Sequence, residues 1–234
     1  MEVTIRSPLI QEKLDRVINE FHYLCDKSNV DLTDYNNPEI ECNVGEARGK
    51  GVEWFASEEY LRERMLPRWN EHIGYPKTYR IFPVERLAGR REDDPEWMKY
   101  WNWGRYELPP EIGTASSALF VHYPVDGLTG WHTNWNANAY QILFTWSETG
   151  DGFFRYYDKQ KDEVVTVEDK PGWQCRWYYF GRKDEPDHHC WHTCYTRCRR
   201  MTLAFKFSNN GLDYDEDAMA RMLRDELVNE IESP

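Results

Sequence analysis

The chain has 234 residues, a formal net charge of −12 and an aromatic content of 15%. So acidic a chain is not expected to bind nucleic acid, because phosphate binding needs a basic surface that releases counterions. No apolar run is long enough to span a bilayer, and no basic-then-apolar segment at the N-terminus indicates a signal peptide. We therefore expect a cytoplasmic protein of one domain, with no membrane partner, whose six cysteines are thiols.

The N-terminal part of the chain is predicted to contain two helices. Ser7 and Pro8 are typical of a helix start, and the apolar residues that follow recur at helical spacing: Ile10, Leu14, Val17, Ile18, Phe21 and Leu24. Ser57 indicates the start of a second helix, because the two glutamates after it favour the positive end of the helix dipole. Residues 29–51 are polar and rich in turn signals, so we expect a loop there.

Two further stretches precede the main β region. Residues 79–87 have the pattern of a strand. Residues 90–110 combine charged residues with tryptophans, and they are predicted to form a long ordered loop or a short helix. Such a segment beside a β-barrel is a candidate lid over a binding site, and the alternative is that it covers the core.

From residue 116 the pattern changes to short apolar runs between turn signals. The runs predicted as strands are 118–123, 140–146, 152–157, 164–167, 174–180 and 201–207, and 124–130 is turn-rich. The tail has an apolar stripe at helical spacing, made by Met219, Met222, Leu223, Leu227 and Ile231. We therefore predict an α+β fold in one domain, 1–234. Helices and loops in 1–115 support a jelly roll of the double-stranded β-helix kind in 116–208, and 209–234 adds a C-terminal helix.

One motif in this β region indicates a metal site. His132 and Asn134 lie two positions apart, so on a strand both side chains leave the same face and reach one point. Arg200 and Thr202 likewise share one face of the last strand, and the apolar residues between and after them occupy the other. A guanidinium beside a hydroxyl suits a carboxylate, because it offers a planar fork of donors and one further hydrogen bond.

A further metal ligand must come from another part of the chain. Its predicted source is the histidine-rich segment 188–192, just before the last strand. The spacing to Arg200 favours His192, and His189 is the rival ligand. His188 or His189 could equally orient a ligand without touching the metal.

These residues together resemble the motif of the iron(II)- and 2-oxoglutarate-dependent oxygenases. In that family His-x-Asp/Glu is followed by a distal His and then by Arg-x-Ser/Thr. The flanking segments are similar as well, namely Tyr123 with the turn up to Gly127, the glycine-rich run 150–158, and the turn and strand 170–180. The resemblance covers about residues 116–207, and the strand order around His132 looks most like the prolyl-hydroxylase branch.

The resemblance implies an activity and its cofactors. The implied enzyme uses Fe(II), 2-oxoglutarate and O2, with ascorbate as a further candidate cofactor. It hydroxylates a peptide, a protein side chain or a small molecule and releases succinate and CO2. Two histidines and one oxygen ligand leave positions on the metal for these reactants. The residues that the resemblance assigns are His132, Asn134 and His192 to iron, and Arg200, Thr202 and Tyr123 to 2-oxoglutarate.

The chain departs from the family pattern at Asn134, where the family has a carboxylate. A neutral amide oxygen is a poorer ligand for a divalent cation than an anionic oxygen. Three interpretations follow. Asn134 binds the metal weakly, or it leaves a position open for water, halide or substrate, or the pocket is degenerate and serves as a non-catalytic binding module.

A second hypothesis concerns the cysteines in the same segment. Cys190, Cys194 and Cys198 lie among the histidines, and such a combination is found in zinc and iron–sulfur sites. The paired Cys-x2-Cys motif that is usual in structural zinc sites is absent from the sequence. The alternative function is therefore a zinc-binding or non-catalytic jelly-roll protein. If the oxygenase interpretation holds, these cysteines are neighbours of the iron pocket or small packing residues.

Overall fold

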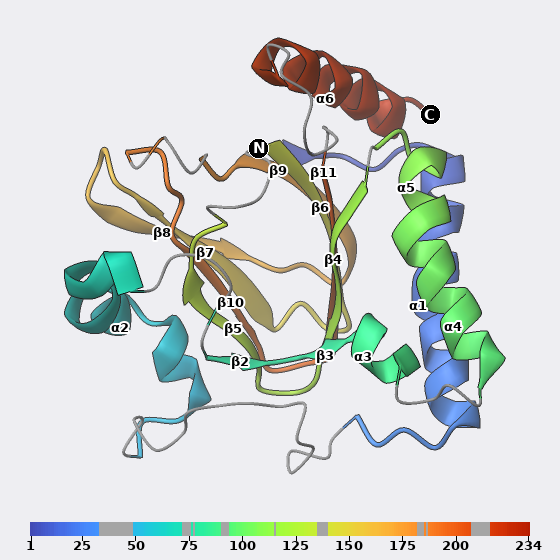
Figure 1. Ribbon diagram of the computed structural model, residues 1–234, viewed down its shortest axis with the longest axis horizontal. Helices are drawn as coiled ribbons and strands as arrows, with labels where there is room; N and C mark the ends of the chain where they lie inside the picture. The colour runs from blue at the N-terminus through green and yellow to red at the C-terminus, as the bar shows by residue number, and fades with distance from the viewer. Residues whose placement is uncertain are drawn as a thin grey trace.

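Two antiparallel sheets form the centre of the structure, a computed structural model that describes residues 1–32, 49–71, 76, 78–89, 94–114, 116–134, 140–181, 185, 187–206 and 216–234. The strands are β1 (Glu2–Val3), β2 (Tyr79–Arg80), β3 (Phe82–Pro83), β4 (Ser116–Tyr123), β5 (Gly127–His132), β6 (Tyr140–Ser147), β7 (Gly152–Asp158), β8 (Glu163–Glu168), β9 (Gly172–Tyr179), β10 (His192–Thr196) and β11 (Arg200–Lys206). The larger sheet has the order β1-β9-β6-β11-β4-β3, and the smaller has the order β2-β5-β10-β7-β8. Figure 1 shows the two sheets facing each other.

The predicted strands are confirmed over most of the β region, with two corrections. Residues 127–130, predicted as part of a turn, belong to β5, because they pair with β10 and because Gly130 N donates to Thr78 O at 2.8 Å. The predicted strand 79–87 ends at Pro83, and Val84 begins a short helix instead. Residue 207, the predicted end of the last strand, lies outside the described residues.

Alternation along β11 divides its side chains between two environments. Met201, Leu203 and Phe205 are fully buried in the core cluster on the helix-covered face of the larger sheet. Arg200 and Thr202 point the other way, into the space between the sheets. The predicted separation of polar and apolar faces on this strand is confirmed, as the pleat of a strand requires.

The helical elements surround this pair of sheets. They are α1 (Pro8–Lys27), η2 (Val52–Ala56), α2 (Glu58–Tyr60), η3 (Leu61–Met65), η4 (Leu66–Glu71), α3 (Val84–Gly89), α4 (Pro95–Asn102), η5 (Trp103–Glu107), α5 (Leu108–Glu111) and α6 (Glu216–Glu232). Both predicted N-terminal helices are present, and Ser57 caps α2 by accepting a hydrogen bond from Tyr60 N at 3.0 Å. No helix in the described part of the chain has both the length and the apolar character that crossing a membrane requires.

The stretch proposed as a lid covers the core instead. Its described part, residues 94–110, lies in α4, η5 and α5, which pack beside α1 against the larger sheet (Figure 1). Trp97 packs edge-on against Phe21 with ring centroids 5.9 Å apart, and Tyr100 OH donates to Val17 O at 2.9 Å. These contacts hold the segment on the face of the sheet that is turned away from the smaller sheet. Residues 90–93 lie outside the described residues.

Helix α6 lies across one end of the sheets, at the top of Figure 1. Leu227 and Ile231 of the predicted apolar stripe are buried, and Ile231 O accepts hydrogen bonds from Arg6 N and Ser7 N. Met222, assigned to the same stripe, is 52% exposed, so the stripe is shorter than predicted. The side chains of residues 219 and 223 lie outside the described part.

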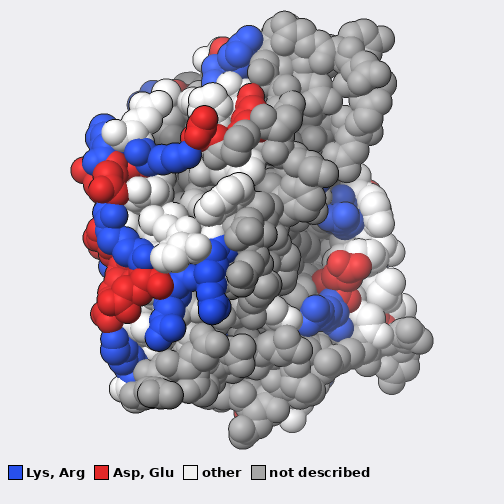
Figure 2. Space-filling model, turned by 60° about the vertical axis from the view of Figure 1, so that its left-hand side comes forward, with Lys and Arg blue, Asp and Glu red and all other residues white. Residues whose placement is uncertain are grey.

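Exposed charges form neighbouring pairs of opposite sign on the face that Figure 2 presents. Arg62 Nη1 lies 2.8 Å from Asp162 Oδ1 between η3 and the β7–β8 turn. Arg197 pairs in the same way with Glu53 and Asp151. Surface pairs of this kind contribute little stability each, about 0–1 kcal/mol, so they say more about local charge balance than about folding.

Candidate active site

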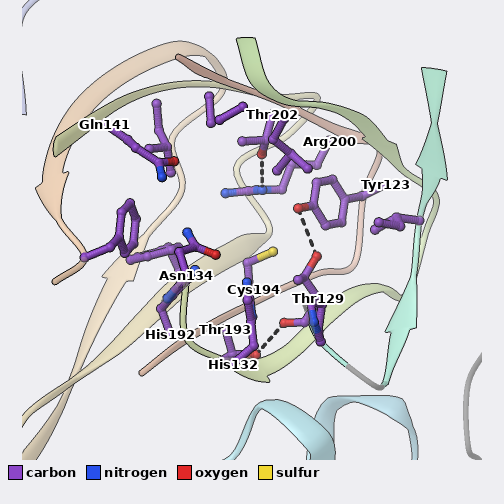
Figure 3. A pocket seen from close by; sticks show the side chains of 18 of the residues that line it. Tyr123, Thr129, His132, Asn134, Gln141, His192, Thr193, Cys194, Arg200 and Thr202 are labelled. Carbon is purple, nitrogen blue, oxygen red and sulfur yellow. Dashed lines mark hydrogen bonds between the residues drawn. The ribbon is translucent and has the colours of Figure 1, made fainter. Parts of the chain in front are cut away.

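A cavity of about 280 Å³ lies between the two sheets. Its walls come from β4, β5, β6, β7, β10 and β11, so it is the space into which the inner faces of both sheets point. Figure 3 shows the polar side chains that converge on it. All six residues predicted for the site line this cavity, namely Tyr123, His132, Asn134, His192, Arg200 and Thr202.

His132 and His192 are direct cross-strand partners on β5 and β10. Their ring centroids are 4.1 Å apart, and both residues are more than nine-tenths buried. The sequence placed them on separate segments, and antiparallel pairing brings them together. His192 rather than His189 is therefore the histidine that lies opposite His132.

Hydrogen bonds fix the orientation of both imidazole rings. His132 Nδ1 lies 2.8 Å from Gly130 O, and His192 Nδ1 lies 2.9 Å from Cys190 O. A carbonyl oxygen only accepts, so each Nδ1 carries the proton and donates it. In the neutral ring Nε2 then keeps a lone pair, which is the arrangement that metal-binding histidines usually have.

Both rings are neutral in the folded, metal-free protein. Burial lowers the pKa of His132 to about 4. Burial, with the neighbouring His132 ring as a second cause, lowers the pKa of His192 well below its ordinary value. Near neutral pH the two residues therefore present two imidazole lone pairs, as metal ligation requires.

Asn134 completes the predicted set of metal ligands. It follows the end of β5, and Figure 3 shows its side-chain amide projecting into the same cavity. Within the described ranges no group of three or more His, Cys, Asp or Glu side chains is placed to hold a metal ion. Among the described residues, the predicted ligands that line the cavity therefore offer a metal two imidazole nitrogens and a neutral amide oxygen.

The other histidines of the segment lie elsewhere. His188 is exposed and makes an edge contact with Tyr179, with ring centroids 6.2 Å apart. His189 lines a separate surface groove together with Trp69 and Trp191. Neither residue lines the central cavity.

Arg200 is held at the cavity wall by a buried ion pair that the sequence did not reveal. Its Nε donates to Asp169 Oδ2 at 2.8 Å, and its Nη1 donates to Thr202 Oγ1 at 2.6 Å. Both charged side chains are almost completely buried. Burial alone disfavours the charged guanidinium, but the charge of Asp169 overrides it and raises the pKa of Arg200. Nη2 and part of Nη1 remain as donors for a ligand.

Gly152 makes this ion pair geometrically possible. A Cβ atom at residue 152 would lie 2.8 Å from Asp169 Oδ2 and 2.9 Å from Thr196 Oγ1. The backbone contributes as well, because Asp169 N donates to Gly152 O at 2.9 Å. A glycine in the run 150–158 therefore serves here to let a carboxylate approach β7.

Tyr123 lies beside Arg200 on the neighbouring strand β4. The Arg200 guanidinium carbon is 5.1 Å from the centre of the Tyr123 ring, and Thr129 Oγ1 donates to Tyr123 OH at 3.0 Å. Burial raises the pKa of Tyr123 well above its ordinary value, so the phenol stays neutral. Its hydroxyl proton remains available to a ligand or a neighbour inside the cavity.

The three cysteines of the zinc hypothesis have three different environments. Cys194 lines the central cavity, whereas Cys198 Sγ lies 3.3 Å from Ser147 Oγ at the far end of β6. Cys190 Sγ makes a long contact with Trp191 O. The five cysteines that the structure describes are all free thiols, as predicted, and residue 42 lies outside the described part.

Sequence reasoning missed two charged groups at this site, Asp169 and Lys206. Lys206 lines the cavity from the last residue of β11. Its position was available from the sequence, because strand alternation places it on the same face as Arg200 and Thr202. Asp169 carries no such signal, since it follows the end of β8 and its partner on β11 is 31 residues away.

Comparison with known proteins gives only distant matches. No family model matches the sequence, and no curated protein matches it. A prolyl-4-hydroxylase from Pseudomonas putida is similar at 13% identity over 68% of this chain and 88% of that chain, with a TM-score of 0.33. The ribosomal oxygenase YcfD from Escherichia coli is similar at 16% identity over 70% and 49%, with a TM-score of 0.30. Peruvianin-I, a cysteine peptidase from Thevetia peruviana latex, is similar at 13% identity over 39% and 50%, with a TM-score of 0.28. At these scores the matches carry no argument about activity.

Proposed function

We propose that the protein is an iron(II)- and 2-oxoglutarate-dependent oxygenase that hydroxylates a small molecule or a peptide or protein side chain. One observation carries the proposal. Two adjacent, buried and neutral imidazoles have their Nδ1 atoms tied to backbone carbonyls, and they line the same cavity as a buried arginine and threonine.

The strand order supports the jelly-roll part of the prediction. The strands β9-β6-β11-β4 lie in one sheet and β5-β10-β7-β8 in the other. Eight strands that pass in this way between two facing sheets have the arrangement expected of a double-stranded β-helix. In such a fold the interior between the sheets is where ligands bind.

The donor set fits Fe(II) when charge is counted. His132, His192 and Asn134 are all neutral, so an anionic ligand must balance the double positive charge of the ion. Doubly charged 2-oxoglutarate balances it completely. Arg200 is already balanced by Asp169, so this part of the cavity would be neutral once loaded. An uncompensated charge at such a buried site would be strongly unfavourable.

The remaining residues suit the cosubstrate. The free Nη2 edge of Arg200 and the Thr202 hydroxyl suit the far carboxylate of 2-oxoglutarate. Tyr123 flanks this position with a neutral hydroxyl. Apolar side chains on the same walls, among them Leu119, Leu143 and Phe180, exclude water from the reacting groups.

When bound, iron would supply the activation of O2. One oxygen atom would enter the substrate as a hydroxyl and the other would enter succinate, with release of CO2. The role of this chain's residues is to bind and orient. The two histidines would hold the metal, and Arg200 with Thr202 would bind the end of the cosubstrate that does not react.

The test is an anaerobic titration of iron-loaded protein with 2-oxoglutarate, followed by the visible absorption that chelation of iron(II) produces. We expect a saturable band that His132→Ala abolishes and Arg200→Ala weakens by about tenfold or more in affinity. His188→Ala is the matched control, because it removes an exposed histidine of the same segment and should leave the band unchanged. Tight iron binding with no response to 2-oxoglutarate would refute the proposal.

A second candidate function is a pocket that binds without turnover, and Asn134 is the observation that favours it. A neutral ligand holds iron(II) more weakly than a carboxylate does. This alternative predicts the absorption band in the absence of air but no formation of succinate in its presence. Measurement of succinate after admission of O2 therefore separates the two functions.

A further inference from the structure

Lys206 is a cation that lines the central cavity. It is half-buried at the end of β11 and lines the cavity on the same strand face as Arg200. Within the part of the chain that the structure describes, no carboxylate lies at ion-pair distance from its Nζ. Other described cations that are buried or half-buried have such a partner, as Arg200 does in Asp169 and Arg199 does in Glu148.

The described surroundings of Lys206 carry more positive than negative charge. Burial, and then the charge of Arg105, lower the pKa of Lys206. Arg105 is exposed and donates to Ser117 O at 2.9 Å on the adjacent strand β4. It lines a second cavity, together with Arg86 and Glu85, and this cavity shares Ala118 and Leu119 with the first. A local excess of positive charge therefore continues outward from the cavity, although the chain as a whole has a net charge of −12.

Position along the strand separates Lys206 from the groups assigned to the cosubstrate. Arg200 and Lys206 lie at opposite ends of β11, and Thr202 and Ala204 lie between them on the same face. Six residues of strand correspond to roughly 20 Å. One small dicarboxylate that reaches from a metal at the histidines to Arg200 would therefore leave Lys206 free.

We propose that Lys206 binds the carboxylate of the substrate, so that the substrate is a small monocarboxylic acid. The proposal rests on the proposed function, because that function neutralises the rest of the cavity. With iron, 2-oxoglutarate and the Arg200–Asp169 pair in balance, one positive charge is left, and one negative charge on the substrate compensates it.

The chemistry of the site favours a carboxylate over a phosphate. A single ammonium is a compact point charge with three donors. Its described neighbours along the cavity wall are uncharged: the apolar Ala118, Leu119 and Ala204, and Gln141, its cross-strand partner on β6. A phosphate dianion would need a second cation or several additional donors at the same point. The cavity volume of about 280 Å³ suits a small acid with an apolar chain rather than a folded protein segment.

The test measures binding of hexanoate by calorimetry to four proteins: wild type, Lys206→Met, Lys206→Arg and Lys99→Met. Lys99→Met removes an exposed lysine of α4 far from the cavity and is the control. We expect Lys206→Met to weaken hexanoate binding by about tenfold or more, the size of one charge-assisted hydrogen bond. Lys206→Arg and Lys99→Met should bind as wild type does. Hexanamide, which has the same shape without the charge, should bind wild type as weakly as hexanoate binds Lys206→Met.

Three results would overturn the proposal. The first is equal hexanoate affinity in wild type and Lys206→Met. The second is tighter binding of butyl phosphate than of hexanoate to wild type. The third is a loss of 2-oxoglutarate affinity in Lys206→Met, which would make Lys206 part of the cosubstrate site.

The experiment is run on metal-free protein and again on the anaerobic complex with iron(II) and 2-oxoglutarate. In metal-free protein hexanoate binding needs neither iron nor cosubstrate, and the difference between wild type and Lys206→Met measures the contribution of Lys206. In the complex 2-oxoglutarate occupies Arg200, so hexanoate has only the Lys206 position. Formation of the complex is read from its visible absorption and tests the proposed function. If the absorption is absent but Lys206→Met still weakens hexanoate binding, the oxygenase proposal is refuted and the acid site is kept. If the absorption forms but Lys206→Met leaves hexanoate binding unchanged, the acid site is refuted and the oxygenase proposal is kept.

Discussion

His132 and His192 lie directly opposite each other on β5 and β10, with ring centroids 4.1 Å apart. Each ring donates from Nδ1 to the carbonyl of the residue two positions before it, Gly130 O in one case and Cys190 O in the other. The two histidines therefore have the same tautomer for the same local reason. The same hydrogen bond in both histidines orients the two Nε2 lone pairs in the metal-free protein, which reduces the conformational entropy lost when a metal binds.

We predict that Asn134→Asp strengthens binding of iron(II) by about tenfold or more, because an anionic oxygen replaces a neutral one at a divalent cation. The measurement is an anaerobic titration with a competing chelator of known affinity. Asn134→Ala is the matched control and should bind iron no more tightly than wild type. An Asn134→Asp variant with unchanged affinity would mean that residue 134 does not contact the metal.

The buried ion pair between Arg200 and Asp169 gives a second prediction. Asp169→Asn leaves the buried Arg200 charge uncompensated, so it should lower the free energy of unfolding by about 3–5 kcal/mol. The measurement is urea denaturation at neutral pH. Asp187→Asn is the control, because its pair with Lys159 is exposed, and its effect should stay within about 0.5–1 kcal/mol. Equal effects of the two substitutions would show that Arg200 is hydrated in the folded protein.

Sequence patterns predicted the parts of the fold that depend on local periodicity. The stripe of α1 and the alternation of β11 are examples, because burial of one face repeats at a fixed interval in both. The predicted strand 79–87 failed at Val84, since two-residue strands such as β3 and the short helix after it leave too few residues for either period.

Features of the site that depend on long-range contact were less accessible. The motif residues His132 and Arg200 were predicted because spacing within a strand constrains where side chains point. Asn134 was expected on the same strand as His132, but β5 ends at His132, and Asn134 lines the cavity from the residues that follow. The pairing of Asp169 with Arg200 joins residues with no common period, and it depends on the missing side chain of Gly152. The choice between His189 and His192 likewise became clear only from the register of β10 on β5.

Buried His122 gives a prediction about pH. It is fully buried on β4, stacked on Phe21 at 4.7 Å, and neither ring nitrogen has a hydrogen-bond partner among the described residues. Burial, and then the nearby His22 and Arg199, lower its pKa from 6.5 to about 3. Between these two values the unfolded chain binds a proton that the folded protein does not. The free energy of unfolding should therefore fall as the pH falls from 6.5 towards 3.

Urea denaturation of metal-free protein at pH 7.5 and pH 5 measures this effect. Below pH 6.5 one such histidine contributes a loss of up to about 1.4 kcal/mol per pH unit. His122→Phe removes the titrating group and keeps a stacked ring, so it should reduce the difference between the two pH values. All other histidines are common to both proteins, so their contributions cancel in the comparison. An unchanged difference would show that His122 is not the group responsible.

The last prediction concerns the reactivity of Cys198. Burial opposes ionisation of this thiol, but hydrogen bonds from Ser147, Thr149 and Thr196 outweigh it and lower the pKa to about 7. Burial acts unopposed on Cys190 and raises its pKa to about 12. The thiolate is the reacting species, so the rate at which iodoacetamide modifies Cys198 should rise with a midpoint near pH 7, whereas the rate for Cys190 should rise only at much higher pH. Peptide mapping by mass spectrometry measures the two rates.

Ser147→Ala removes one donor to the sulfur, and it should move the midpoint of the rate profile of Cys198 to higher pH. A midpoint that stays near 7 in Ser147→Ala would mean that the other hydroxyls, or the basic side chains beside residue 198, hold the thiolate instead.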